Sequence, residues 1–352
     1  MSVIAAADIG YSNLKLAWLV VPKGEDPFDA LFTSLQQAGS DSEAVRASSA
    51  LEARITPAGA APVSDLADAQ ASDLPGHVVS VDGVDWRAPI DFKDAQVNHR
   101  DFSTEYVKRD AWMALLLGSL AEIEEPVIDT LVLGLPCNEY YRSQGMRDLV
   151  VERAKGEHKI GDKIVQVKEV KVIPQPLGTF YGYIMTTEPD VAEFLMESLV
   201  LVLDPGYYSL DCVLVSEGSR IFQNTSMSTP NSVKAVCDQL RSKLKEEKGI
   251  PVQDGLIESR LRQGKMVIPG ATGMYNFESD LHEVAKDVAE QSLSEIRSRL
   301  HSAEREPNVA ILTGGGAGLF EPYVKEGVHV PNVLKAEDSV MMNVLGYLRA
   351  AC

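Results

Sequence analysis

The sequence predicts an α/β protein built from two related domains that flank a cleft. Two observations predict this. A hydrophobic run that ends in an acidic, glycine-containing turn occurs twice, about two hundred residues apart, and strand and helix patterns alternate after each copy. A ligand most often binds in the cleft between such domains. The two turns read Asp8-Ile9-Gly10-Tyr11-Ser12-Asn13-Leu14-Lys15 and Asp204-Pro205-Gly206-Tyr207-Tyr208-Ser209-Leu210-Asp211.

Each turn follows a short apolar run, residues 3–7 and 199–203, which is typical of a buried strand. Alternation and turn signals predict the remaining strands: residues 16–21, a hairpin over 78–86 with an Asp-Gly turn, 130–136, a strand or hairpin over 163–173, and 309–313. Helical spacing and breakers predict the helices: 104–122, 141–155, one that begins at Pro174, 231–248, 279–305 with Ser279 as a candidate N-cap, and 338–350. Residues 36–75 are rich in Ala, Ser, Asp and Gly, so we expect a variable insertion or small subdomain there.

Composition excludes several classes of protein. The net charge is −18, which disfavours direct contact with nucleic acid or an anionic membrane; solubility explains it simply, and a basic partner protein is the alternative. No apolar run approaches the ~18 residues of a membrane span. The four cysteines form no C-x-x-C pair and no signal peptide is evident, so we expect a reducing cytoplasm. The six histidines lack metal-ligand spacing.

The first turn has the residues needed to bind a phosphate group and a cation. Gly10 lets the backbone approach phosphate, Ser12 and Asn13 can donate hydrogen bonds, and Lys15 supplies positive charge. Asp8 can hold Mg²⁺ through water. A plain β-turn with solvated side chains is the alternative.

The second turn repeats the pattern with Asp204, Gly206 and Ser209, which favours a nucleotide held by two facing turns. Asp211 is either part of that site or a residue that stabilises the turn. The run Thr313-Gly314-Gly315-Gly316-Ala317 can place bare backbone against a nucleoside, although glycine runs also form ordinary loops.

Gln175 is the candidate for orienting an attacking water molecule, because a neutral amide is too weak a base to deprotonate one. The alternative is a helix-start residue between two prolines. The sequence has no G-x-x-x-x-G-K-[ST] loop, no G-x-G-x-x-G after the first strand and no G-x-S-x-G elbow.

The order of these motifs resembles the actin-like ATPase superfamily, which includes Hsp70-type chaperones and sugar kinases of ribonuclease H-like fold. The resemblance rests on the two turns, Gly134-Leu135-Pro136 with Tyr140-Tyr141, Pro174-Gln175, Gly314 to Gly316 and Gly346. The Leu-Pro-x-x-x-Tyr-Tyr phrase is most similar to the ParM/StbA plasmid-segregation actins and related archaeal proteins. The segment 36–75 has no clear counterpart in the family.

The resemblance implies ATP or GTP with Mg²⁺ between the domains. Asp8 and Asp204 would face the metal through water. The phosphates would contact Gly10, Tyr11, Ser12, Asn13, Lys15, Gly206, Tyr207, Tyr208, Ser209 and Asp211. The nucleoside would contact Gly314 to Gly316 with Ala317. Gln175 would position the water, and Gly134 to Pro136 and Gly346 would lie at hinges. Pro205 departs from the family pattern and removes an N–H from the second turn.

The resemblance also implies a domain plan. The first domain would cover 1–173, with a small subdomain over 31–98, and residues 336–352 would complete it; the second would cover 174–335, with a small subdomain over 226–300. We expect a filament-forming, Mg-dependent NTPase that moves plasmid DNA through a DNA-binding adaptor. The alternatives are a small-molecule kinase of the same superfamily and a nucleotide-binding regulator that does not polymerise. A chaperone is disfavoured, since no peptide-binding region follows the second domain.

Overall fold

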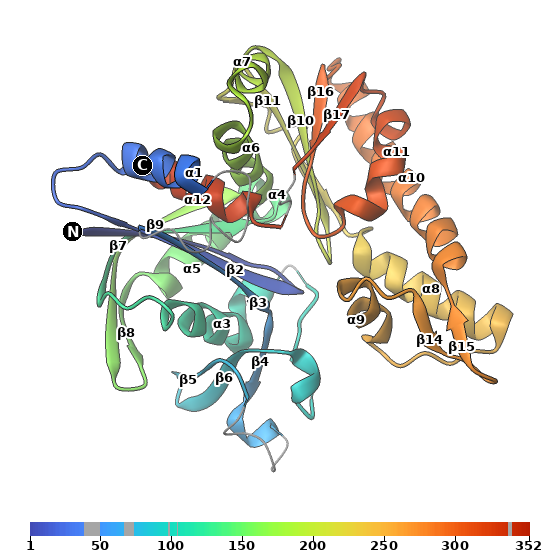
Figure 1. The fold of residues 1–352 in the computed structure, drawn as a ribbon, viewed down its shortest axis with the longest axis horizontal. Helices are drawn as coiled ribbons and strands as arrows, with labels where there is room; N and C mark the ends of the chain where they lie inside the picture. The colour runs from blue at the N-terminus through green and yellow to red at the C-terminus, as the bar shows by residue number, and fades with distance from the viewer. Residues whose placement is uncertain (39–49, 67–73, 98, 104, 337–339) are drawn as a thin grey trace. The chain divides into compact units, whose positions relative to one another are not determined.

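The computed structural model describes residues 1–38, 50–66, 74–97, 99–103, 105–336 and 340–352. The chain divides into two compact units, residues 1–197 with 336–352 and residues 198–335 (Figure 1). The division falls after residue 197, whereas the expected boundary lay at 173/174. The chain passes between the units near 197/198 and 335/336, so Gly134 and Gly346, the expected hinge positions, lie inside unit 1.

The central sheet of unit 1 has the strand order β3-β2-β1-β7-β9-β8. Its strands are β1 Ser2–Ile9, β2 Asn13–Val21, β3 Leu51–Pro57, β7 Val127–Leu135, β8 Gly156–Ile160 and β9 Lys163–Pro174. β1 runs antiparallel to β2 and parallel to β7. The predicted strand at 130–136 is confirmed as β7, and of the two alternatives for 163–173 the single strand is confirmed, since β9 runs unbroken through these residues. Its hairpin partner, β8, comes earlier in the chain and pairs with it antiparallel.

Both faces of this sheet are buried, which is why β1 reads as an unbroken apolar run. Ala5 and Ala7 belong to a core that includes residues of α3 and α5. Ile4 and Ala6 point to the other face, into a core with residues of α1, α6 and α12. The helices of unit 1 are α1 Pro27–Ala38, α3 Asp110–Leu120, α4 Cys137–Arg142, α5 Gln144–Ala154, α6 Gln175–Thr186, α7 Pro189–Glu197 and α12 Met342–Ala351.

Two helix predictions for unit 1 need correction. The helix expected over 141–155 is two helices that break at Ser143, whose φ of −131° and ψ of 88° are not helical. The helix expected over 104–122 begins with a separate 3-10 turn, Tyr106–Lys108, before α3. The expected C-terminal helix is present as α12, and residues 338–339 of that prediction lie outside the described part of the chain.

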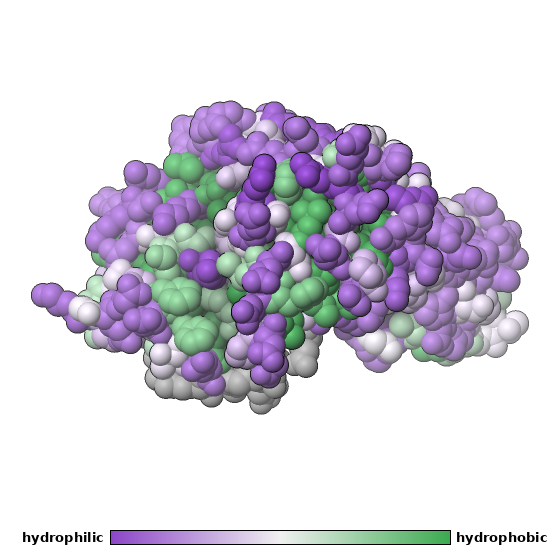
Figure 2. All heavy atoms as spheres, turned by 90° about the horizontal axis from the view of Figure 1, so that it is seen from above, coloured by the Kyte–Doolittle hydropathy of each residue, from purple (hydrophilic) through white to green (hydrophobic). Residues whose placement is uncertain are grey.

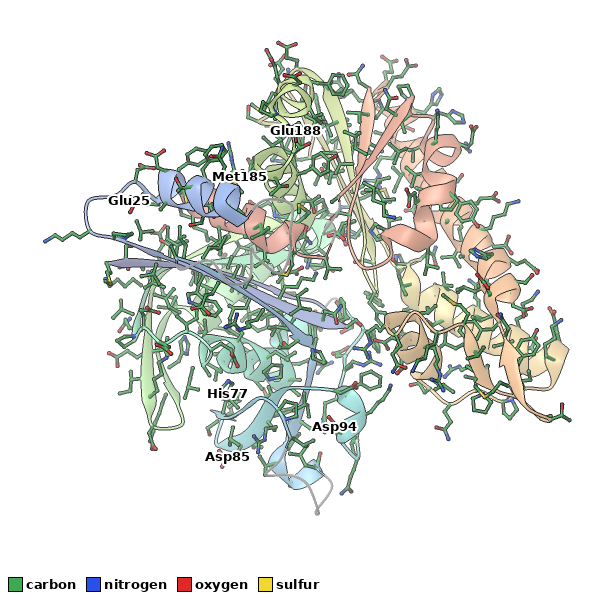
Figure 3. All side chains as sticks on the ribbon, in the orientation of Figure 1. Glu25, His77, Asp85, Asp94, Met185 and Glu188 are labelled. Carbon is green, nitrogen blue, oxygen red and sulfur yellow. The ribbon has the colours of Figure 1, made fainter. Side chains whose placement is uncertain are left out.

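A smaller sheet of three strands, in the order β4-β6-β5, also belongs to unit 1. Its strands are β4 Gly59–Pro62, β5 His77–Val81 and β6 Val84–Ile90. Asp82 and Gly83 join β5 to β6 with φ of 49° and 82°, so the predicted Asp-Gly hairpin is confirmed. Figure 3 labels His77 and Asp85 on this hairpin; His77 Nε2 lies 2.6 Å from Glu122 Oε1.

The described residues of the segment 36–75 form regular elements that its composition did not indicate. Residues 51–57 form β3, which pairs along β2 from Asn13↔Pro57 to Leu19↔Leu51, and residues 59–62 form β4. Residues 39–49 and 67–73 of this segment lie outside the described residues. The sequence of β3 shows little alternation of apolar and polar residues because only two of its positions, Leu51 and Ala53, are buried.

Unit 2 contains one sheet in the order β12-β11-β10-β16-β17, with β13 beside β11, and a separate β14-β15 pair. Its strands are β10 Leu199–Pro205, β11 Leu210–Ser216, β12 Arg220–Ile221, β13 Met227–Thr229, β14 Val267–Pro269, β15 Met274–Asn276, β16 Val309–Leu312 and β17 Asn332–Lys335. Its helices are α8 Val233–Lys248, α9 Leu256–Arg262, α10 Glu278–Ser302 and α11 Ala317–Val328.

The long helix of unit 2 starts one residue earlier than expected. Phe277 occupies the cap position of α10, so the prediction of Ser279 as N-cap is wrong. Asn276 Oδ1 accepts a hydrogen bond from the backbone N–H of Glu278 at 2.9 Å and so satisfies one of the free amides at the helix start. Phe277 is fully buried, and its packing fixes where the chain enters the helix.

The internal repeat is confirmed at the level of strand register. β1 pairs with β2 and then lies parallel to β7, and β10 pairs with β11 and then lies parallel to β16. Asp8 lies opposite Lys15 in the first hairpin, and Asp204 lies opposite Asp211 in the second. None of the described helices is long and apolar enough to span a membrane.

Candidate functional site

The carboxylate of Asp8 is the centre of the polar cluster in unit 1. It stands near the end of β1 and is 1% exposed. Lys15, its cross-strand neighbour, places Nζ 2.6 Å from Asp8 Oδ2. Gln175 Nε2 donates to Asp8 Oδ1 at 2.9 Å. The structure thus brings together three residues that the sequence marked separately.

The cluster contains a residue that the sequence analysis missed. Asn343, on α12, donates from Nδ2 to Asp8 Oδ2 at 3.4 Å, and its Oδ1 accepts a hydrogen bond from the hydroxyl of Thr179 on α6. A single Asn in an apolar C-terminal helix matches no sequence motif. Its polarity at a position expected to be buried was the one feature of the sequence that could have indicated it.

Gln175 is the first residue of α6 and follows Pro174, the last residue of β9. Proline at this point ends the strand, and a second proline, Pro176, suits the first turn of the helix. The side chain of Gln175 is half-buried and its amide is 2.9 Å from the Asp8 carboxylate. The backbone of Gln175 starts a helix, as the alternative interpretation expected. Its side chain nevertheless belongs to the Asp8 cluster.

The turn of the first hairpin is tied to its surroundings by backbone bonds. Gly10 N donates to Asn13 O at 3.2 Å, and Ala58 N donates to Ser12 O at 3.0 Å. A Cβ on Gly10 would lie 2.9 Å from Asn13 O, so a larger residue would push the turn open. The chain after β3 therefore helps to hold the turn in place.

The side chain of Tyr11 is directed into unit 1. Its ring stacks on Tyr106 with centroids 4.8 Å apart, and its hydroxyl donates to Ser103 O at 3.1 Å. These contacts leave only its backbone for a ligand. Tyr11 therefore fixes the outer side of the turn.

The second hairpin turn closes in the same way as the first. Gly206 N donates to Ser209 O at 2.8 Å, the equivalent of the bond from Gly10 to Asn13. Ser232 Oγ donates to Gly206 O at 2.6 Å and Lys234 N to Tyr207 O at 2.7 Å, which joins the turn to the start of α8.

The polar side chains of this turn have different partners from those in unit 1. Both oxygens of Asp211 accept hydroxyl hydrogen bonds, one from Ser209 Oγ at 2.6 Å and one from Ser228. Asp211 is 2% exposed. These contacts favour the turn-stabilising role that the sequence left open. Tyr207 lines a small hollow with Asp238 and Arg241, and Tyr208 is half-buried.

The glycine run of unit 2 follows β16 directly and lies against the second hairpin. Gly316 N donates to Pro205 O at 2.8 Å. Pro205 lacks an N–H, but its carbonyl makes the bond that joins the two loops. Gly314 has φ of +79°, and a Cβ there would overlap the carboxylate of Asp204. Only glycine fits this position.

The glycine run also offers open backbone. Gly315 is exposed, and no atom lies within 4 Å of the place its Cβ would take. Asp204, 6% exposed, lies beside Gly314 at the end of β10. Unit 2 thus combines a buried carboxylate with uncovered main chain, which are the features that a nucleotide site requires. The residues of each unit therefore fit a nucleotide.

Among the described residues, no group of three or more His, Cys, Asp or Glu side chains could hold a metal ion. Asp8 and Asp204 are single carboxylates, each in its own unit. Mg²⁺ binds nucleotide enzymes through one or two carboxylates together with water and phosphate oxygens. This donor set suits a metal that arrives with phosphate rather than one held by protein alone.

Two family models match the chain. The model "Actin like proteins N terminal domain" matches residues 39–178, and the model "Archaeal actin homologue MreB-like, C-terminal" matches residues 202–326. The chain belongs to the actin-like superfamily. The first match begins at residue 39, so the expectation that 36–75 has no family counterpart is wrong. No curated protein sequence matches this actin-like chain.

Solved structures show the same actin-like fold. The archaeal actin homologue Ta0583 is 17% identical with a TM-score of 0.69, and 99% of each chain is covered. The complex of Ta0583 with ADP is 18% identical with a TM-score of 0.63, again over 99% of each chain. A ParM of a 15-stranded filament from Clostridium botulinum is 14% identical with a TM-score of 0.67, over 99% of this chain and 98% of the other.

Proposed function

We propose that this actin-like chain binds ATP or GTP with Mg²⁺, hydrolyses the γ-phosphate and assembles into filaments while the nucleotide is bound. The observation that carries the proposal is the duplicated hairpin. Each copy has an aspartate as the second-last residue of a buried strand, closes its turn with the same backbone bond and lies beside a parallel strand. A triphosphate gripped by both turns accounts for this duplication.

In the proposed mechanism, unit 1 supplies the group that directs water. Gln175 would hold the attacking water in line with the γ-phosphate, since its amide can donate and accept but is a poor base. Its hydrogen bond to Asp8 fixes the amide against a buried carboxylate. Mg²⁺ would neutralise charge that develops on the phosphate oxygens. Lys15 would share its charge between Asp8 and phosphate, which its position beside Asp8 supports.

Unit 2 would bind the rest of the nucleotide. We propose that Asp204 faces the metal through water, that the amides of the turn from Gly206 to Ser209 contact phosphate, and that Gly314 to Gly316 with Ala317 meet the nucleoside. The exposed backbone at Gly315 supports this assignment. The ADP complex of Ta0583 gives a relative of the same fold that binds such a nucleotide.

Filament formation is proposed from the superfamily and from the surface. A ParM from Clostridium botulinum with this fold forms filaments. Apolar side chains lie among hydrophilic ones on the face in Figure 2, and large exposed apolar residues occur on α1 and α7. These residues are Phe28, Phe32, Phe194 and Met196.

The cargo would be plasmid DNA in the cytoplasm, reached through a separate DNA-binding adaptor because a net charge of −18 opposes direct DNA contact.

The test combines two measurements on the purified protein. Phosphate release is followed with ATP or GTP and Mg²⁺ and no acceptor, while light scattering follows assembly. We expect both signals to rise with nucleotide. Asp204→Asn and Gln175→Ala are each expected to slow phosphate release by ~100-fold, the scale of a lost charge-stabilising or orienting group. Gln144→Ala, an exposed glutamine of unit 1, is the matched control and should keep the wild-type rate.

Different results favour the alternatives. Release that requires an added acceptor would identify a small-molecule kinase. Nucleotide binding without assembly, and with Gln175→Ala as active as wild type, would identify a non-polymerising regulator. Scattering that stays flat with nucleotide across a broad range of protein and salt concentrations would refute filament formation.

A further inference from the structure

Asn343 connects the C-terminal helix to the carboxylate at the centre of the unit 1 cluster. It lies in the first turn of α12 and is 3% exposed. Both ends of its amide have partners: Nδ2 donates to Asp8 Oδ2 at 3.4 Å, and Oδ1 accepts from the hydroxyl of Thr179. Thr179 is itself fully buried. A buried polar pair of this kind has a cost in desolvation unless each group is satisfied, as both are here.

The carboxylate of Asp8 only accepts hydrogen bonds, so it selects the Nδ2 end of the Asn343 amide. The hydroxyl of Thr179 donates to Oδ1 and holds the amide in that orientation. If the amide turned over, its oxygen would face the negative Asp8 and two acceptors would oppose each other. The hydroxyl of Thr179 therefore acts on Asp8 through Asn343.

The backbone around Asn343 cannot shift to absorb changes. α12 crosses α6 at glycines, and a Cβ on Gly346 would overlap the carbonyl oxygen of Gly178. A Cβ on Gly182 would likewise meet the carbonyl of Met342. Met185, labelled near α12 in Figure 3, packs in the same core as residues of α1 and α12. The two helices are therefore fixed at van der Waals distance.

These contacts complete a frame around the two proposed functional groups. Gln175 begins α6, and Thr179 lies one turn later on the same helix. Gln175 contacts Asp8 Oδ1, while Asn343 contacts Asp8 Oδ2. The carboxylate is thus held from three elements: α6 through Gln175, α12 through Asn343, and β2 through Lys15, whose Nζ is 2.6 Å from Oδ2.

We propose that Asn343, oriented by Thr179, is a positioning residue that sets the rotation of the Asp8 carboxylate toward Mg²⁺ and its waters. This inference rests on the proposed nucleotide function. Groups that orient a metal-facing carboxylate affect metal affinity or activity by ~10-fold or more when removed. Loss of Asn343 changes the requirement for Mg²⁺ and leaves metal-free nucleotide binding nearly unchanged.

The experiment measures binding of a fluorescent ADP analogue as Mg²⁺ is titrated, together with the rate of hydrolysis. Asn343→Ala and Thr179→Val are each expected to raise the Mg²⁺ concentration for half-maximal effect by ~10-fold. The affinity for the analogue in EDTA should stay within about threefold of wild type, because the amides and glycines of the turns remain. The double variant should resemble either single one, since both act through one contact.

Two controls separate positioning from folding. Thr179→Ser keeps the hydroxyl and should restore the wild-type Mg²⁺ response. Ser119→Ala removes a buried hydroxyl from α3, whose partner is Leu116 O at 2.7 Å, and should not change the response. If Asn343→Ala does not fold, Thr179→Val alone carries the test.

The possible outcomes differ for the two proposals. Wild-type protein without nucleotide binding defeats the proposed function and this inference with it. The inference alone is refuted if the wild type responds to Mg²⁺ and both Asn343→Ala and Thr179→Val need the same half-maximal Mg²⁺ concentration as the wild type. A Thr179→Ser variant that behaves like Thr179→Val also refutes it.

Discussion

Asp8 shows how a single buried charge is accommodated at the residue scale. A carboxylate that is 1% exposed needs compensation for the water it has lost. Lys15 provides a full charge, and the amides of Gln175 and Asn343 provide donors. Asp8 therefore has partners from β2, α6 and α12, which fix its geometry.

Removing the positive partner should destabilise the protein. Lys15→Met leaves Asp8 buried without an opposite charge, and breaking a buried pair in this way costs about 3 kcal/mol. Urea unfolding followed by circular dichroism measures the loss. The double variant Asp8→Asn with Lys15→Met should recover most of it, because no charge is left unpaired. Equal stability of Lys15→Met and wild type would show that water already solvates Asp8.

Cysteine reactivity gives a second prediction at this scale. Cys137, Cys212 and Cys237 are buried, while Cys352 is exposed. The Cys352 thiol nevertheless turns back toward Leu348 O at 3.2 Å, and its burial raises its pKa to about 11. Burial also raises the pKa of Cys212, to about 12.

A raised pKa lowers the fraction of reactive thiolate at any given pH. At pH 8 about one Cys352 in a thousand would be thiolate, against about one in four for an ordinary thiol. We expect iodoacetamide to label Cys352 slowly in the folded protein, with the rate rising about tenfold from pH 8 to 9. Mass spectrometry would locate the label. Modification of Cys212 before unfolding would contradict this prediction.

At the scale of elements, the crossing of α6 and α12 determines the geometry of the Asp8 cluster. The helices meet at glycines, so Gln175 and Asn343 approach the same carboxylate from two directions. β3 has a similar role for the first hairpin, since it pairs along β2 and the chain after it donates to Ser12 O. Helix and strand partners thus position the turn jointly.

A methyl group at the helix crossing should be costly. Gly346→Ala would place Cβ against the Gly178 carbonyl and force the helices apart, which we expect to destabilise unit 1 by about 3 kcal/mol. Gly145→Ala is the matched control, because no atom lies within 4 Å of its Cβ position in α5. It should be neutral or stabilise by up to about 1 kcal/mol. Urea unfolding that gives the two variants equal stability would refute tight packing at the crossing.

At the scale of the molecule, two units with separate cores each carry one copy of the hairpin. Neither copy has enough donors to hold a triphosphate alone in the proposed mechanism. The proposal therefore requires that both copies contribute to affinity, and this can be measured without any assay of hydrolysis.

Nucleotide should stabilise the whole chain by mass action. MgADP at 100 times its dissociation constant adds about 2.7 kcal/mol, which corresponds to a rise of about 4 °C in the melting temperature of a chain of this length. Differential scanning fluorimetry would record it. Asp8→Asn and Asp204→Asn should each remove most of the rise, although they lie in different units. A full rise in either variant would mean that the corresponding hairpin does not take part.

Local sequence patterns were enough to predict several elements of the fold. Apolar runs before Asp8 and Asp204 predicted the two hairpins, and the Asp-Gly pair predicted the β5–β6 turn, because strand period and turn chemistry are local. Such patterns failed for Ser279 and for residues 51–57, where a buried aromatic and a neighbouring strand outweigh local preference. Contacts between side chains that are distant in the sequence could not be predicted in this way. Gln175 is 167 residues from Asp8 and Asn343 is 335 residues away, and their contacts depend on strand order and on a helix crossing, which no local pattern encodes.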